Sequence, residues 1–294
     1  MSQQDTQAAP LDRALLDRQR RRHWRGPEAP PAFLAESVAQ ELTERLSLVQ
    51  RRFDIGMDLA GHRGELAGHI AAGGQVEWLV RVERDPLWLE GSALAIVADE
   101  EALPLADESV DLVLSNLSLH LTNDTPGTFV QIRRALKPDG LFLAAMLGGE
   151  TLTELRQSLI VAEAEIAGGA APRVLPFVEL RDAGALLQRT GFALPVIDQD
   201  RLTVRYDTMF ELMADLRAMG MANILTARSR RPATRKLFLR AAEIYAERFA
   251  DADGRIRATF DVVYLSGWRP HDSQQKPLRP GSAKASLAEA LTRK

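Results

Sequence analysis

Short apolar segments alternate with helical patterns between Phe53 and Gly149, and this alternation limits the possible folds more than any other feature of the 294-residue chain. Apolar runs of about four to eight residues between turn residues are typical of buried strands. Strands that alternate with helices need crossover connections, so we predict an α/β fold with a mostly parallel sheet and helices on both faces. The five expected strands are Ile55–Leu59, Val76–Val82, Leu94–Ala98, Val110–Asn116 and Leu141–Leu147.

Two further strands are expected later in the chain, one over Ala193–Tyr206 and one where apolar residues alternate from Ile256 to Tyr264. The segment between them, about 207–254, has mainly helical periodicity. We therefore predict an antiparallel hairpin at a sheet edge, with a helical insertion between its strands. Thr151-x-x-Glu154 and Thr208-x-x-Glu211 match the capping box and predict two helix starts.

The chain divides into three expected parts: a basic arm and helix (1–50), a main domain (51–270) and a tail (271–294). Within the arm, Leu11 to Arg25 holds six arginines and two aspartates. Three interpretations stay open for it: a solvated helix face, the remnant of a transit peptide, or a docking arm for an acidic surface. A second helix is predicted from Phe33 to about Val49.

Composition excludes several classes of function. The chain has no Cys, so disulfides, thiolate metal sites and a Cys nucleophile are ruled out. Its 37 basic and 40 acidic residues argue against a generally basic nucleic-acid binder. No apolar run approaches the roughly 18 residues of a membrane helix, and the first ten residues lack the core of a secretory signal. We expect a cytoplasmic protein, and peripheral membrane association is left open.

Ligands of open α/β sheets bind at the carboxyl ends of the strands, and three of these ends carry suitable residues. The first strand enters a glycine-containing turn before a helix, where backbone N–H groups can face an anionic ligand. The second strand ends in an acid placed to bind ribose hydroxyls, and the third in an acidic pair that can bind the adenine amine. The expected cofactor-binding residues are Asp58, Gly61, His62, Gly64, Glu83, Asp99 and Glu100.

Each of these acids alone is better explained as a capping residue, but their combination favours a nucleoside-bearing cofactor. Ser115, Asn116 and His120 follow the fourth strand and are the candidate catalytic residues. His120 is equally well explained as a capping or buried hydrogen-bonded residue. No general base is evident, and methyl transfer depends mainly on alignment. No histidine begins a His-x-Asp or His-x-Glu motif, so no metal site is predicted.

Residues Asp58 to Gly149 resemble a class I S-adenosylmethionine-dependent methyltransferase domain. The resemblance rests on the turn Asp58–Gly64, on Glu83 and Asp99-Glu100, and on Val110-Asp-Leu-Val and Leu136-Lys-Pro-Asp-Gly140. It implies a Rossmann-like sheet of seven strands and S-adenosylmethionine as the cofactor.

A narrower resemblance covers nearly the whole chain. It is to the methyltransferase-like assembly factors of respiratory complex I, which hydroxylate an arginine of the quinone-proximal iron–sulfur subunit. This family implies a protein substrate, a complex I subunit. The stretches that carry it are Asp17-Arg-Gln-Arg-Arg-Arg-His-Trp24, Val97-Ala-Asp-Glu-Glu-Ala-Leu-Pro104, Leu117-Ser-Leu-His120, Gly148-Gly-Glu-Thr-Leu-Thr-Glu-Leu-Arg156, Met209-Phe-Glu-Leu-Met-Ala-Asp-Leu-Arg-Ala-Met-Gly220, Tyr264-Leu-Ser-Gly-Trp268 and Gly281-Ser-Ala.

The first turn departs from the pattern of these families, because Ala60 and His62 stand where glycines are usual. A non-glycine residue in the left-handed conformation costs about 1–2 kcal/mol. The pocket is therefore altered but functional, adapted to a different ligand, or unable to bind the cofactor. The alternatives to a protein-modifying enzyme are a non-catalytic assembly chaperone and a small-molecule or acyl-carrier methyltransferase of the biotin-synthesis type. The basic Arg228–Lys236 stretch is either a solvated loop or a contact for an acidic protein.

Overall fold

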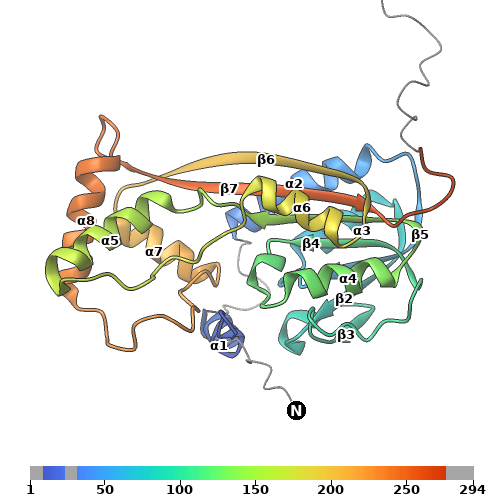
Figure 1. The fold of residues 1–294 in the computed structure, drawn as a ribbon, viewed down its shortest axis with the longest axis horizontal. Coiled ribbons are helices and arrows are strands. Elements are labelled where there is room, and N and C mark those ends of the chain that lie inside the picture. The colour runs from blue at the N-terminus through green and yellow to red at the C-terminus, as the bar shows by residue number, and fades with distance from the viewer. Residues whose placement is uncertain (1–8, 24–31, 276–294) are drawn as a thin grey trace, which may run out of the picture.

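A mixed sheet with helices on both faces forms the centre of the computed structural model, which describes residues 9–23 and 32–275 (Figure 1). Within these ranges the sheet has seven strands in the order β3-β2-β1-β4-β5-β7-β6. This is the predicted α/β fold. The tail beyond residue 275 and the break around Gly26-Pro27 and Pro30-Pro31 lie outside the described residues.

The bounds of most elements agree closely with the sequence pattern, but the fifth strand begins at Leu136 and not at the expected Leu141. The strands are β1 (Phe53–Leu59), β2 (Val76–Glu83), β3 (Ala95–Val97), β4 (Val110–Asn116), β5 (Leu136–Leu147), β6 (Ala193–Tyr206) and β7 (Ile256–Trp268). The helices are α1 (Arg13–His23), α2 (Phe33–Ser47), α3 (Glu65–Gly73), α4 (Thr125–Ala135), α5 (Thr153–Ala167), α6 (Leu180–Arg189), α7 (Met209–Ala218) and α8 (Arg235–Phe249), with short 3₁₀ turns η1 (Pro86–Leu89) and η2 (Leu119–Leu121).

The strand pairing confirms the predicted hairpin. Strands β1 to β5 pair in parallel, whereas β7 runs antiparallel to both β5 and β6. Because β6 lies at the edge, the β6–β7 hairpin closes one side of the sheet. Helices α7 and α8 lie between its two strands in the chain, as the helical periodicity of that segment predicts. All parallel strands end on the same side, where the candidate ligand residues follow them.

Two apolar layers hold the helices on the sheet. One layer joins α4 and α6 to one face, where Phe142 packs against Phe129 and Phe192 with ring centroids 5.2 and 5.3 Å apart. The other joins α2 and α3 to the opposite face and continues to α5, α7 and α8. The latter three helices gather around the far end of the long hairpin and form a second lobe (Figure 1). Helix α1 lies between the two lobes, near α7.

The predicted capping box at Thr151 is wrong, because tertiary contacts use both of its side chains. The Thr151 hydroxyl donates to the backbone oxygen of Asp261 and accepts from its N–H, both at 3.0 Å. Glu154 accepts from the N–H of Thr259 at 3.1 Å. Helix α5 therefore begins without a side-chain cap. The second capping residue is confirmed, since the Thr208 side chain accepts from the N–H of Glu211 at the start of α7.

No helix in the described part of the chain combines the length and the apolar character needed to cross a bilayer.

Replacing Thr151 with Val should destabilise the fold by about 1–3 kcal/mol, because a buried backbone N–H and a carbonyl of β7 lose their hydroxyl partner. Thr153→Val is the matched control, since Thr153 is only partly buried and makes one 3.4 Å contact with Gln157. Urea denaturation measures both variants. Equal stability of the two would contradict the role assigned to Thr151.

Candidate functional site

The turn after β1 is built over a buried ion pair. Asp58 is fully buried, and Arg81 on β2 donates to its carboxylate at 3.3 Å. The same guanidinium binds the backbone oxygen of Trp88 at 2.8 Å, the hydroxyl of Ser92 at 3.0 Å and the backbone oxygen of His62. Burial raises the pKa of Asp58, and Arg81 opposes this shift. Arg81 thus connects the turn to the segment that follows β2.

The backbone of the turn takes the left-handed conformation at the two positions where glycine is usual. Ala60 has φ 54° and His62 has φ 52°, while Gly64 has φ 84°. Gly61 is required by packing, because a Cβ there would lie 2.3 Å from the Asp58 carboxylate oxygens. At Gly64 a Cβ would lie 2.9 Å from the Arg81 guanidinium carbon. The turn keeps the left-handed backbone despite its altered sequence.

The acid expected to bind ribose stands behind the turn. Glu83 is 5% exposed at the end of β2, and its carboxylate accepts from the N–H of His62. Burial raises its pKa to about 7, although Arg20 and the His62 N–H favour the charged form. The imidazole of His62 lies 4.0 Å from the same oxygen, and its pKa is lowered well below the usual value by burial and by Arg20. His62 is therefore neutral at physiological pH.

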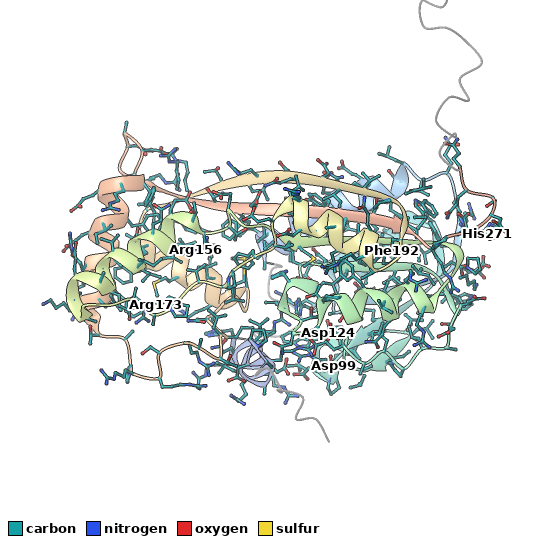
Figure 2. The ribbon with its side chains drawn as sticks, viewed as in Figure 1. Asp99, Asp124, Arg156, Arg173, Phe192 and His271 are labelled. Carbon is teal, nitrogen blue, oxygen red and sulfur yellow. The ribbon has the colours of Figure 1, made fainter. Side chains whose placement is uncertain are left out.

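The two acids expected to bind adenine are paired with the N-terminal arm. Arg13 on α1 reaches Asp99 at 2.8 Å, Glu100 at 2.5 Å and Glu101 at 2.5 Å. Asp99 lies at the edge of the domain beside α1 (Figure 2). Its pKa stays below the usual value because the Glu101 N–H and Arg13 outweigh the effect of burial.

Two more ion pairs hold α1 in the same place. Arg21 binds Asp85, and Arg84 binds Asp17 at 2.5 Å. Of the three interpretations of the basic arm, the structure supports a docking arm, and the acidic surface belongs to the same chain.

The candidate catalytic residues differ in their surroundings. Ser115 is fully buried and donates to the backbone oxygen of Leu59 at 3.0 Å, which is a structural contact. Asn116 donates to Ala35, and its side-chain oxygen has no partner among the described residues. His120 receives a weak 3.5 Å contact from the Leu147 N–H, and burial lowers its pKa to about 3, with a smaller effect from Arg20. Asn116 and His120 line a cavity, whereas Ser115 does not.

The cavity has a volume of about 540 Å³ and lies between the turn after β1 and the second lobe. This is within the usual range for small-molecule and cofactor pockets, about 300–1,000 Å³. One end is formed by Gly61, His62 and Trp88, and the other by the segment after α5 and the end of α7. Arg173, which belongs to the second lobe in Figure 2, contributes to the latter wall. Glu83, Asp99 and Glu100 do not line it.

Unpartnered polar atoms in and beneath this pocket fit a ligand with hydrogen-bond donors. One oxygen of Asp58, the side-chain oxygen of Asn116 and the Nδ1 atom of His62 are buried without a hydrogen-bond partner among the described residues. Buried polar groups are nearly always paired, so such a concentration marks a site that a ligand can complete. The ammonium of an amino-acid ligand supplies donors of the required kind. On this test the residues present fit the amino-acid part of such a ligand.

The described ranges hold no group of three or more His, Asp or Glu side chains placed to bind a metal ion. His69 binds Glu36 at 2.8 Å, and His62 faces Glu83.

Sequence reasoning missed three arginines of the site. Arg81 lies under the turn, and Arg13 lies against the acidic ends of the strands. Arg20 lies in the wall of the pocket. Arg81 had a local signal, because an arginine inside an otherwise apolar strand needs a buried partner. The roles of Arg13 and Arg20 depend on where α1 docks, and the local pattern does not determine that position.

The sequence of the chain is similar to those of known proteins. The family pattern described as a methyltransferase domain matches residues 72–144, which begin after the turn. The arginine-hydroxylase NDUFAF5 of Danio rerio, named as mitochondrial, is 41% identical over 263 residues, 87% of this chain and 81% of that protein. The Homo sapiens protein of the same name is 38% identical over 287 residues, 95% of this chain and 82% of its own.

The chain belongs to the NDUFAF5 arginine-hydroxylase family. A malonyl-[acyl-carrier protein] O-methyltransferase of Xylella fastidiosa is also similar, with 33% identity over 250 residues, 81% of this chain and 82% of that enzyme.

Solved structures show the same fold at low sequence identity. The YcgJ protein of Bacillus subtilis superposes with a TM-score of 0.56 at 14% identity, covering 79% of this chain and 99% of that one. The [4+2]-cyclase SpnF superposes with a TM-score of 0.52 at 17% identity, covering 84% and 86%. The Rossmann-like methyltransferase fold expected from the sequence is therefore confirmed.

Glu83→Gln should make the protein more stable at neutral pH. The native carboxyl has a pKa of about 7 and its usual value is 4.5, so stability falls as the pH rises from 4.5 to 7. Glutamine can still accept from the His62 N–H without a charge. We expect a gain on the order of 3 kcal/mol near pH 8 and almost none near pH 4, measured by denaturation across this range. Glu77→Gln, on an exposed part of β2, is the control. A difference independent of pH would contradict the shifted pKa.

Proposed function

We propose that this protein binds S-adenosylmethionine or a close relative in the 540 Å³ pocket and acts on an arginine side chain of a protein. The observation that carries the proposal is the side-chain oxygen of Asn116, which has no partner among the described residues and lies in a pocket beside the turn after β1. That position is the ligand edge of an open α/β sheet. The identity to arginine hydroxylases over most of both chains supplies the reaction and its class of substrate.

Named residues would hold the cofactor. Asn116 would accept hydrogen bonds from its ammonium, and Glu83, freed from the His62 N–H, would accept them from the ribose hydroxyls. Asp99 and Glu100 are paired with Arg13, so they would bind the adenine only after these ion pairs had been broken. When bound, the group supplies a sulfonium centre, and the chain's own contribution is to position ligand and substrate and to exclude water.

The proposed substrate is an arginine of a complex I iron–sulfur subunit, and we place the protein among the assembly factors of that complex. Helix α1 and the second lobe both form walls of the pocket, so a protein segment that approached it would contact both. The non-catalytic chaperone and the acyl-carrier methyltransferase remain the alternatives, and the two experiments below separate them.

After deletion of the gene, the peptide that carries the substrate arginine of the iron–sulfur subunit should be lighter by the mass of one oxygen atom. Peptide mass spectrometry of purified complex I measures this difference. Re-expression of the wild type should restore the missing mass. A chaperone predicts less complex but unchanged arginine masses in what remains. A mass difference of one methyl group would show methyl transfer instead. Malonyl-acyl carrier protein incubated with the purified chain should gain no methyl group, and methylation there would support the biotin-type alternative.

Calorimetric titration with S-adenosylmethionine should show one site in the wild type. His62→Gly should bind within about tenfold of it, because glycine relieves a left-handed residue worth about 1–2 kcal/mol but removes one wall of the pocket. His69→Gln, outside the pocket, is the control for loss of a histidine. If only His62→Gly binds, the natural chain has lost its cofactor and the scaffold interpretation replaces this one.

A further inference from the structure

Arg20, in the wall of the pocket, has no ion-pair partner among the described residues. Arg20 lies on α1, half-buried, and lines the cavity together with His62 and His120. Within the described residues, its guanidinium makes no ion pair within 4.0 Å and no hydrogen bond, unlike Arg13 and Arg21 on the same helix. A cation held in low dielectric without a partner is unfavourable, and an anion that enters the pocket would offset this cost.

Arg20 lies close to the two imidazoles that line the same pocket. Its charge contributes to the lowered pKa values of both His62 and His120, so it lies near the two imidazoles. Burial lowers its own pKa to about 10, which leaves it charged at neutral pH. Glu83, Glu100 and Asp17 act on it through space, but their carboxylates are bonded to the His62 N–H, Arg13 and Arg84 respectively.

The second lobe is shaped to admit this side chain. Gly220, just after α7, has φ 71°, and a Cβ there would lie 2.8 Å from the Cγ atom of Arg20. The Arg20 stem therefore crosses from α1 to the second lobe against a glycine that leaves room for it. This contact directs the Arg20 side chain along the pocket wall.

We propose that Arg20 binds the carboxylate of an amino-acid ligand in this pocket, which is the carboxylate of S-adenosylmethionine under the function proposed above. The pairing follows from the donors and acceptors available. A guanidinium binds a carboxylate through two parallel hydrogen bonds, and Asn116 offers its oxygen to the ammonium of the same amino acid. The nucleoside then lies toward Trp88 and Glu83, at the other side of the turn. Helix α1 thereby closes the pocket and reads the charge of the ligand.

The test compares S-adenosylmethionine with decarboxylated S-adenosylmethionine, which lacks only the carboxylate. Wild type should prefer the former by about tenfold or more, the range of a charge-assisted pair. Arg20→Gln should reduce that preference toward unity, mainly by weakening binding of the carboxylate-bearing ligand. Arg20→Lys should keep part of it, because the charge remains but the two-pronged geometry is lost. Arg18→Gln, an exposed arginine on the same helix, should bind both ligands like the wild type.

The ratio of the two affinities separates the possible outcomes and is insensitive to a general loss of stability. If Arg20→Gln weakens both ligands equally, Arg20 only supports the fold or Glu83, and the inference is wrong while the proposed cofactor stands. The same holds if Arg20 serves the carboxylate of a substrate instead, since the preference of wild type would then be absent. If the wild type binds neither ligand, the proposed function and the inference fall together.

Discussion

The ion pair between Arg81 and the buried Asp58 determines the shape of the ligand edge. Because Asp58 has no exposure to solvent, its carboxylate needs a partner, and Arg81 on the neighbouring strand provides one. The same guanidinium holds the backbone oxygens of His62 and Trp88, so it draws the turn and the segment after β2 together. Gly61 and Gly64 are then required by the carboxylate and the guanidinium that press on them. The position of the pocket follows from this cluster.

Helix α1 extends that cluster into the second lobe. Its arginines meet acids that stand at the ends of β2 and β3, where repulsion among Asp99, Glu100 and Glu101 would otherwise be strong. Arg13 relieves this repulsion. On the same helix, Arg20 and Leu16 line the cavity. One helix thus neutralises the acidic edge and forms a wall of the pocket.

Much of the fold could be predicted from the sequence because the determining signals are local. The apolar runs of the parallel strands, the alternation in β7 and the helical insertion each lie within one segment, and the sheet follows from them. The left-handed residues at Ala60 and His62 were also foreseeable, since the turn needs that backbone whatever its side chains. The use of Thr151 by Asp261 was not, because the partner lies on a distant strand that only the folded sheet brings near. The same reason hides the pairing of Arg13 with Asp99.

Several unfavourable groups lie in or beside the pocket, and this grouping bears on function. Glu83 is kept at a pKa of about 7, and His62 is strained and neutral. Within the described part of the chain, the side-chain oxygen of Asn116 and the guanidinium of Arg20 have no partner. Buried polar groups elsewhere are mostly paired, as Asp261 is with Thr151 and Gln199, although the Nε atom of Arg133 and the hydroxyl of Tyr206 also lack a partner among the described residues. A scaffold that had lost its ligand would gain stability by replacing such groups with apolar ones, since buried unpaired polar groups cost about 1–3 kcal/mol each. Their joint presence around a single cavity favours a ligand that completes them over a pocket that has fallen out of use.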